Sequence, residues 1–178
     1  MKTRTIFLFV TAASIIAFLL KLLYAVGKND DLLFMLKPIK SLTALFFNTN
    51  SIYDSSIGFY FKSLNIVIDK SCAGINFWII SFWTAISLWL MQGQDSRYKI
   101  LKFIGLFLIS YIFTIFANTS RIATAILALK LKKIIPLFST PWFHQAEGVF
   151  VYLFFLLIFS LMLNYFFNKL NITHAQRA

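Results

Sequence analysis

The chain has 178 residues, of which 60% are hydrophobic, 19% aromatic and only 13% charged. Soluble domains have about 45–50% apolar and about 25% charged residues, so the composition excludes an ordinary soluble protein and indicates one membrane-embedded domain over residues 1–178. The formal net charge is +11, but the basic residues are scattered between apolar runs, which argues against nucleic-acid binding and is typical of membrane topology.

The first apolar segment, residues 5–26, is long enough to cross roughly 30 Å of hydrocarbon at about 1.5 Å per residue. It follows Lys2 and Arg4 and could be mistaken for a signal peptide. Its apolar run exceeds the core of about 7–15 residues that signal peptides have, and no small-residue cleavage site follows. We therefore expect an uncleaved membrane helix.

The next segment, residues 27–72, is mixed in character. The stretch "DLLFMLKPIKSLTALFF" is apolar but broken by Lys37, Pro38 and Lys40, which predicts an amphipathic helix at the membrane interface. The stretch "SIYDSSIGFYFKSLNIVID" is rich in β-branched and aromatic residues around Gly58, which predicts a short β-hairpin.

Three further apolar segments follow, and the second of them is interrupted by "NTSR"; they occupy residues 73–91, 103–129 and 148–168. With the first segment they predict an all-α polytopic membrane protein. It has about four transmembrane helices, an interfacial helix and a short extracytoplasmic β-hairpin.

Four spans place both termini on one side of the membrane. The short loop at 92–102 and the two termini carry a high density of lysine and arginine, so the positive-inside rule places them in the cytoplasm. Residues 27–72 and 130–147 are then extracytoplasmic. The lysine cluster at 130–133 opposes this arrangement.

This topology brings three polar residues to the extracytoplasmic face: Cys72, Arg121 and His144. Asp69 or Ser71 can cap a helix that begins around Cys72, and a thiol in a first helical turn is favoured as the reactive thiolate. Arg121 stays charged and costs several kcal/mol inside a bilayer, so it needs a counter-charge such as a thiolate or an oxyanion.

The histidine also opens a predicted helix, with Thr140 as N-cap and Pro141 as the first helical residue. The positive end of a helix dipole disfavours imidazolium, so His144 is suited to act as a base. Each of the three has a simpler interpretation: an inert apolar cysteine, a snorkelling arginine and a tolerated interfacial histidine. Their convergence favours a site. A single cysteine excludes an intramolecular disulfide and a multi-cysteine zinc or iron–sulfur site.

The motifs around these residues, "SCAGINF", "NTSRI" and "FHQAEG", resemble those of the exosortase/archaeosortase family and most closely its small exosortase K type. The resemblance covers residues from about 38 to 168. Two departures stand out. Ala73 replaces the serine of the family's "CSG"-like motif, and the chain has fewer spans than typical members.

The resemblance implies a bacterial inner-membrane cysteine protease or transpeptidase, multi-pass, with its active site at the extracytoplasmic face. Cys72 would attack the client as nucleophile and form a thioester, His144 would act as general acid and base, and Arg121 would stabilise the thiolate or oxyanion. The supporting residues would be Asn118, which orients Arg121; Glu147, which orients His144; and Ser71 beside the nucleophile.

The resemblance also names the partners. Clients would be exported proteins that end in a PEP-CTERM-like motif, a transmembrane helix and a basic tail, and the acceptor would be an amine or water. No cofactor or metal is implied. The rival hypothesis is a non-catalytic transport or assembly subunit, in which Cys72 is dispensable and Arg121 pairs structurally with Glu147.

Overall fold

A computed structural model of the chain describes residues 3–92, 98–131 and 141–175, and it is mostly helical with one small sheet. The helices are α1 (Thr3–Val26), α2 (Leu33–Phe47), α3 (Ile75–Met91), α4 (Lys99–Leu131) and α5 (Pro141–Ala175), with short 3-10 turns η1 (Asp30–Leu32) and η2 (Lys70–Cys72). The strands are β1 (Ile52–Asp54), β2 (Gly58–Phe61) and β3 (Ile66–Ile68).

Within the described residues, four helical segments are long and apolar enough to cross a membrane: Thr3–Val26, Lys70–Met91, Lys99–Leu129 and Gln145–Lys169. By the length and composition of these helices, the prediction of a multi-pass membrane protein with four spans is confirmed. α4 runs through "NTSR" without a break. The buried hydroxyl of Thr119 donates back to the helix, from Thr119 Oγ1 to the Ile115 carbonyl oxygen at 2.8 Å, so it is satisfied without water.

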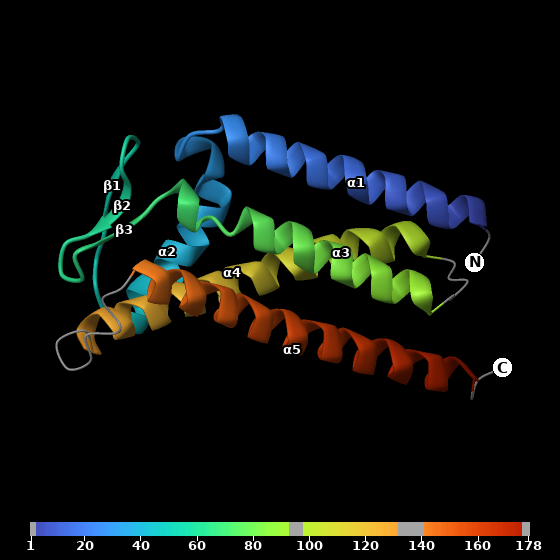
Figure 1. Cartoon of the computed structure of the whole chain (residues 1–178). Coiled ribbons are helices and arrows are strands. Elements are labelled where there is room, and N and C mark those ends of the chain that lie inside the picture. The colour runs from blue at the N-terminus through green and yellow to red at the C-terminus, as the bar shows by residue number, and fades with distance from the viewer. Residues whose placement is uncertain (1–2, 93–97, 132–140, 176–178) are drawn as a thin grey trace.

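The long helices form a bundle in which α3 lies between α1 and α5, with α4 behind it (Figure 1). α3 packs against all three, and α4 also packs against α2 and α5. Both chain ends lie at one end of the bundle, whereas the sheet and α2 lie at the other (Figure 1). The start of α3, the C-terminal half of α4 and the start of α5 therefore meet near the sheet.

Two apolar clusters hold the bundle together. The one nearer the chain termini is aromatic: Phe82 and Trp89 of α3 pack with Phe159 and Phe167 of α5. The other joins the sheet to the helices, because Phe59 and Phe61 of β2, residues of α2 and residues of α4 belong to the same buried cluster. This second cluster positions the sheet against the end of α4.

The predicted hairpin is confirmed as β1 and β2, and a third strand extends it into an antiparallel meander of order β1-β2-β3. Along β2, Phe59 and Phe61 are buried and Tyr60 is exposed, the alternation of a sheet with one covered face. Gly58 has φ +108°, and a Cβ there would lie 2.6 Å from the Ile68 carbonyl oxygen. Only glycine fits at that position.

The predicted interfacial helix corresponds to α2, which continues through Pro38. Proline has no N–H, so the carbonyl of Phe34 one turn earlier loses its helical donor. The hydroxyl of Tyr111 on α4 donates to that carbonyl oxygen at 2.7 Å. A side chain from another helix thus satisfies the group that the proline leaves unpaired.

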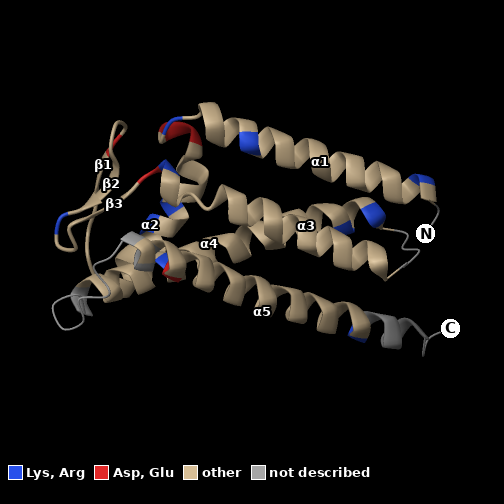
Figure 2. Cartoon of the chain, in the orientation of Figure 1, with Lys and Arg blue, Asp and Glu red and all other residues tan. Residues whose placement is uncertain are grey.

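Charged residues gather towards the two ends of the bundle (Figure 2). Four aspartates lie in the segments around the sheet: Asp30, Asp31, Asp54 and Asp69. Between these ends the described helices carry few charged residues (Figure 2). This distribution suits a protein whose helix ends lie at the two membrane surfaces.

Candidate active site

Cys72 ends the short turn η2 between β3 and α3, and its side chain is half-buried. The carboxylate of Asp69 caps this turn, because Asp69 Oδ1 accepts from the Ser71 amide at 2.9 Å and from the Ser71 hydroxyl at 2.6 Å. The Ser71 hydroxyl also lies 3.8 Å from the Cys72 Sγ. Asp69 therefore caps η2, whereas the N-cap residue of α3 is Gly74, which makes no side-chain cap.

The prediction that α3 begins around Cys72 is wrong by three residues, because α3 begins at Ile75. Gly74 turns the chain with φ +70°, a left-handed conformation that a helix cannot contain. A Cβ on Gly74 would lie 3.2 Å from Asn118 Cγ, so glycine also permits the close approach to α4. Ala73 is fully buried among apolar side chains, which suits a methyl group better than a hydroxyl.

Asn118 fastens this turn to α4. It is fully buried, and its Nδ2 donates to the carbonyl oxygen of Cys72. Its Oδ1 accepts from the hydroxyl of Tyr152 on α5 at 2.6 Å. One amide therefore joins the backbone of the cysteine to two helices. Asn118 and Arg121 both bond to the hydroxyl of Tyr152, and the predicted role of Asn118 in orienting Arg121 stays a prediction.

Arg121 lies one turn after Asn118 and is half-buried. Its Nη1 donates to the Tyr152 hydroxyl at 3.4 Å, and its Cζ lies 5.3 Å from the centre of the Tyr152 ring. Gly148 on α5 makes room for it, because a Cβ there would lie only 2.8 Å from Arg121 Nε. The guanidinium is thus held between α4 and α5.

Glu147 of α5 lies beside α4. Its Oε1 accepts from the hydroxyl of Thr124, one turn after Arg121. The pairing of Arg121 with Glu147 that the rival hypothesis expects stays a prediction.

His144 lies in the first turn of α5, which begins at Pro141 as predicted. Its backbone occupies the helix face of Gly148 and Tyr152, since the three positions are four residues apart. The side chain of His144 and the predicted N-cap Thr140 lie outside the described residues. The role predicted for Glu147, which is to orient His144, therefore stays a prediction.

Two cavities adjoin Arg121. One, of about 240 Å³, lies between β3 and α4 and is lined by both Cys72 and Arg121. The other, of about 420 Å³, lies among α1, α3 and α5 and is lined by Arg121 and Tyr152 together with Ser71 of η2. The thiol and the guanidinium therefore share one cavity, and the arginine connects it with a second.

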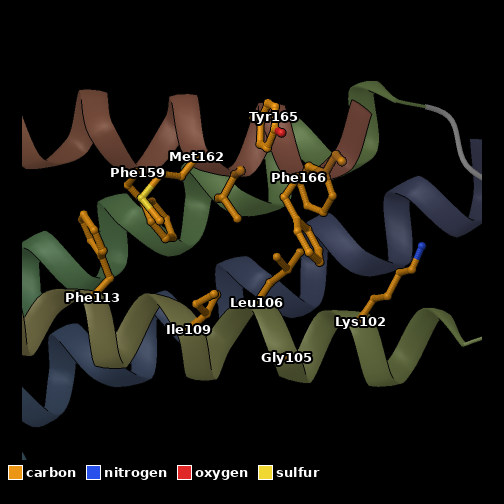
Figure 3. A pocket seen from close by; sticks show the side chains of 11 residues that line it. Lys102, Gly105, Leu106, Ile109, Phe113, Phe159, Met162, Tyr165 and Phe166 are labelled. Atoms are coloured by element: carbon orange, nitrogen blue, oxygen red, sulfur yellow. The ribbon is translucent and has the colours of Figure 1, made fainter. Parts of the chain in front are cut away.

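A larger hollow of about 480 Å³ lies between α4 and α5, near Lys102 and far along both helices from Arg121 and Tyr152. Figure 3 shows side chains such as Phe113 and Phe159 bordering it. Its lining is mostly apolar, apart from Lys102 and Tyr165, and it includes none of the residues predicted for the site.

The structure brings together Cys72, Ser71, Asn118 and Arg121, and it adds residues that sequence reasoning missed: Gly74, Gly148 and Tyr152. Gly148 ends the motif "FHQAEG" without a predicted role, and Tyr152 is marked only by its spacing of eight residues from His144. Among the side chains that the structure describes, no group of three His, Cys, Asp or Glu residues could hold a metal ion. No family model, curated protein or solved structure matches the chain.

Proposed function

We propose that the protein is an exosortase-like membrane cysteine protease or transpeptidase. The observation that carries the proposal is that Cys72 and Arg121 line one cavity, at the point where β3 leads into the helical bundle. Asn118 holds the backbone of the nucleophile and, through Tyr152, is joined to the arginine. A preorganised thiol and guanidinium are the groups that acyl transfer needs.

In the first half-reaction, Cys72 Sγ attacks the carbonyl carbon of the peptide bond before the client's transmembrane tail. The new C–S bond forms, the C–N bond breaks, and the thiol proton passes to the leaving amine through His144. The products are a thioester on the enzyme and a tail with a free amine. Arg121 donates hydrogen bonds to the oxyanion that develops on the carbonyl oxygen.

In the second half-reaction, an acceptor amine or water attacks the thioester carbonyl. The C–S bond breaks, His144 takes the acceptor's proton and returns it to the sulfur, and Cys72 is regenerated. An amine acceptor makes the enzyme a transpeptidase, and water makes it a protease. None of these steps requires a redox change, and the residues named account for every proton.

The location and partners follow from the same proposal. The sheet end of the bundle faces the extracytoplasmic side of a bacterial inner membrane. Clients are exported proteins with a C-terminal PEP-CTERM-like motif, a transmembrane helix and a basic tail. Residue motifs support this, since "SCAGINF", "NTSRI" and "FHQAEG" occur in the order that the exosortase/archaeosortase family shows.

The direct test is to trap the thioester. The enzyme would be co-expressed with a tagged exported protein from the same organism that has such a C-terminus. Because Cys72 is the only cysteine, a hydroxylamine-sensitive adduct of client and enzyme can form only there. We expect the adduct in the unaltered enzyme and a larger amount in His144→Ala, if thioester release is slowed more than its formation.

Two variants serve as controls. Cys72→Ala and Cys72→Ser should both be inserted normally yet leave the client unprocessed, because alanine removes little volume and serine is a poor nucleophile without further activation. Normal processing by Cys72→Ala would end the proposal and favour a transport or assembly subunit. The abundance of each variant in membranes separates lost chemistry from lost folding.

A further inference from the structure

The cavity that holds the thiol is a groove with two apolar walls. One wall is β3, with Ile66, Val67 and Ile68. The other is the C-terminal part of α4, and its lining residues are Ile122, Ala125, Ile126 and Leu129. Cys72 and Arg121 complete the lining, so whatever lies in the groove also lies beside the thiol.

β3 is also one of the two edge strands of the sheet. Within the described residues it pairs only with β2, so the backbone groups on its other side have no strand partner. Edge strands with unpaired N–H and C=O groups are templates for another extended chain. A groove that combines such an edge with apolar walls suits an extended peptide with apolar side chains.

The second cavity differs in polarity and in its neighbours. Its lining includes Ser71, Asn76, Gln145 and Tyr152, all of which carry hydrogen-bonding groups. It is bordered by the ends of three candidate spans, α1, α3 and α5. The groove is bordered by only one of the described long helices, α4, and by the sheet, which lies beyond the start of α3 (Figure 1).

We infer that the groove between β3 and α4 binds the client segment on the acyl side of the scissile bond, as an extended strand with apolar side chains. This inference rests on the proposed function and adds the direction of the client chain. The leaving part must continue into a transmembrane helix, so it passes Arg121 into the cavity bordered by the three spans. The acyl part remains outside, along the sheet.

The test uses a photo-crosslinking amino acid at Val67 in the Cys72→Ala variant, which cannot process the client. The client is the tagged exported protein used above. We expect crosslinks from position 67 to the client residues before the cleavage site. The control is the same amino acid at Ile52 on β1, which does not line the groove; it is 70% exposed against 39% for Val67, so exposure alone would favour the control.

A second pair of variants fills the groove. Ala125→Leu adds three carbon atoms to the side chain on the wall, whereas Ala123→Leu makes the same change on α4 outside the groove. Ala125→Leu should lower the crosslink from position 67 at least fivefold, and Ala123→Leu should change it less than twofold. Both are first checked for normal abundance in the membrane.

The outcomes separate this inference from the proposed function. Crosslinks only to the client's transmembrane tail, to phospholipid or to a second copy of the chain would overturn the groove assignment, even with Cys72→Ala inactive. Equal loss of crosslinking in Ala125→Leu and Ala123→Leu would also overturn it. Processing of the client by Cys72→Ala would instead contradict the proposed function, in which Cys72 is the nucleophile.

Discussion

Gly148 and Gly105 form a matched pair for testing how strictly the position of Arg121 matters. Both lie in long membrane helices, but they differ in what an added methyl group would meet. A Cβ at position 148 would lie 2.8 Å from Arg121 Nε, whereas a Cβ at position 105 has no heavy atom within 4 Å. The methyl group of Gly148→Ala would therefore clash with the guanidinium, whereas that of Gly105→Ala would contact no other side chain.

The size of the effect follows from the contact. Ordinary contact begins at 3.4 Å, so Arg121 or α5 must retreat by about 0.6 Å. A misplacement of about 1 Å at a reacting centre can cost about 100-fold in rate, so we expect Gly148→Ala to slow client processing by about 10-fold to 100-fold. Alanine is a better helix former than glycine, so neither helix should be weakened by propensity.

The assay follows the tagged client by gel mobility, with membrane abundance and detergent melting temperature measured for each variant. Gly105→Ala should process at the unaltered rate. Wild-type processing by Gly148→Ala, next to an inactive Cys72→Ala, would refute the idea that the position of the guanidinium limits the reaction. A drop in melting temperature that matches the lost activity would attribute the effect to folding.

Three further predictions concern the site, α2 and the topology. Tyr152→Phe removes the hydroxyl that bonds to both Asn118 and Arg121 but keeps the ring. Client processing should fall about tenfold, in line with about 1–3 kcal/mol for an unsatisfied buried partner, while membrane insertion stays normal. Unchanged processing would count against a role for this hydrogen-bond network. Tyr111→Phe should lower the free energy of unfolding by about 1 kcal/mol. The loss should be smaller in a Pro38→Ala background, because the backbone N–H that alanine brings to this position can then donate to the Phe34 carbonyl. Equal losses in both backgrounds would contradict that account. Single cysteines in place of Gln94 and Ser56, in Cys72→Ala, should react with an impermeant thiol reagent in intact cells only at position 56; the reverse pattern would invert the proposed orientation.

Part of the site was visible in the sequence because its markers are local. Cys72 is the only thiol, Arg121 is a charge within an apolar run, and Pro141 marks a helix start; each can be recognised from a few neighbouring residues. The start of α3 was placed three residues early. Hydropathy does not register that Gly74 adopts a left-handed conformation, which delays the helix to Ile75.

Other members of the site are set by contacts between distant segments. The bond from Asn118 to the Cys72 carbonyl joins positions 46 apart, and that from Arg121 to Tyr152 joins positions 31 apart. No local pattern of hydropathy or spacing specifies which tyrosine of an aromatic-rich chain will face an arginine. Tyr152 acquires that role because α4 and α5 pack side by side near the sheet.

The sequence by itself determined the membrane class and the four spans. A bilayer is crossed by long apolar helices that satisfy their own backbone groups, and both the length and the hydropathy of such helices can be read directly from the residues. Only the tertiary structure decided that β3 borders the thiol, that Gly148 leaves space for Arg121 and that two cavities of different polarity adjoin the arginine. These features depend on how closely particular side chains of separate helices approach one another. That is a property of packing, which the order of residues along one helix does not display.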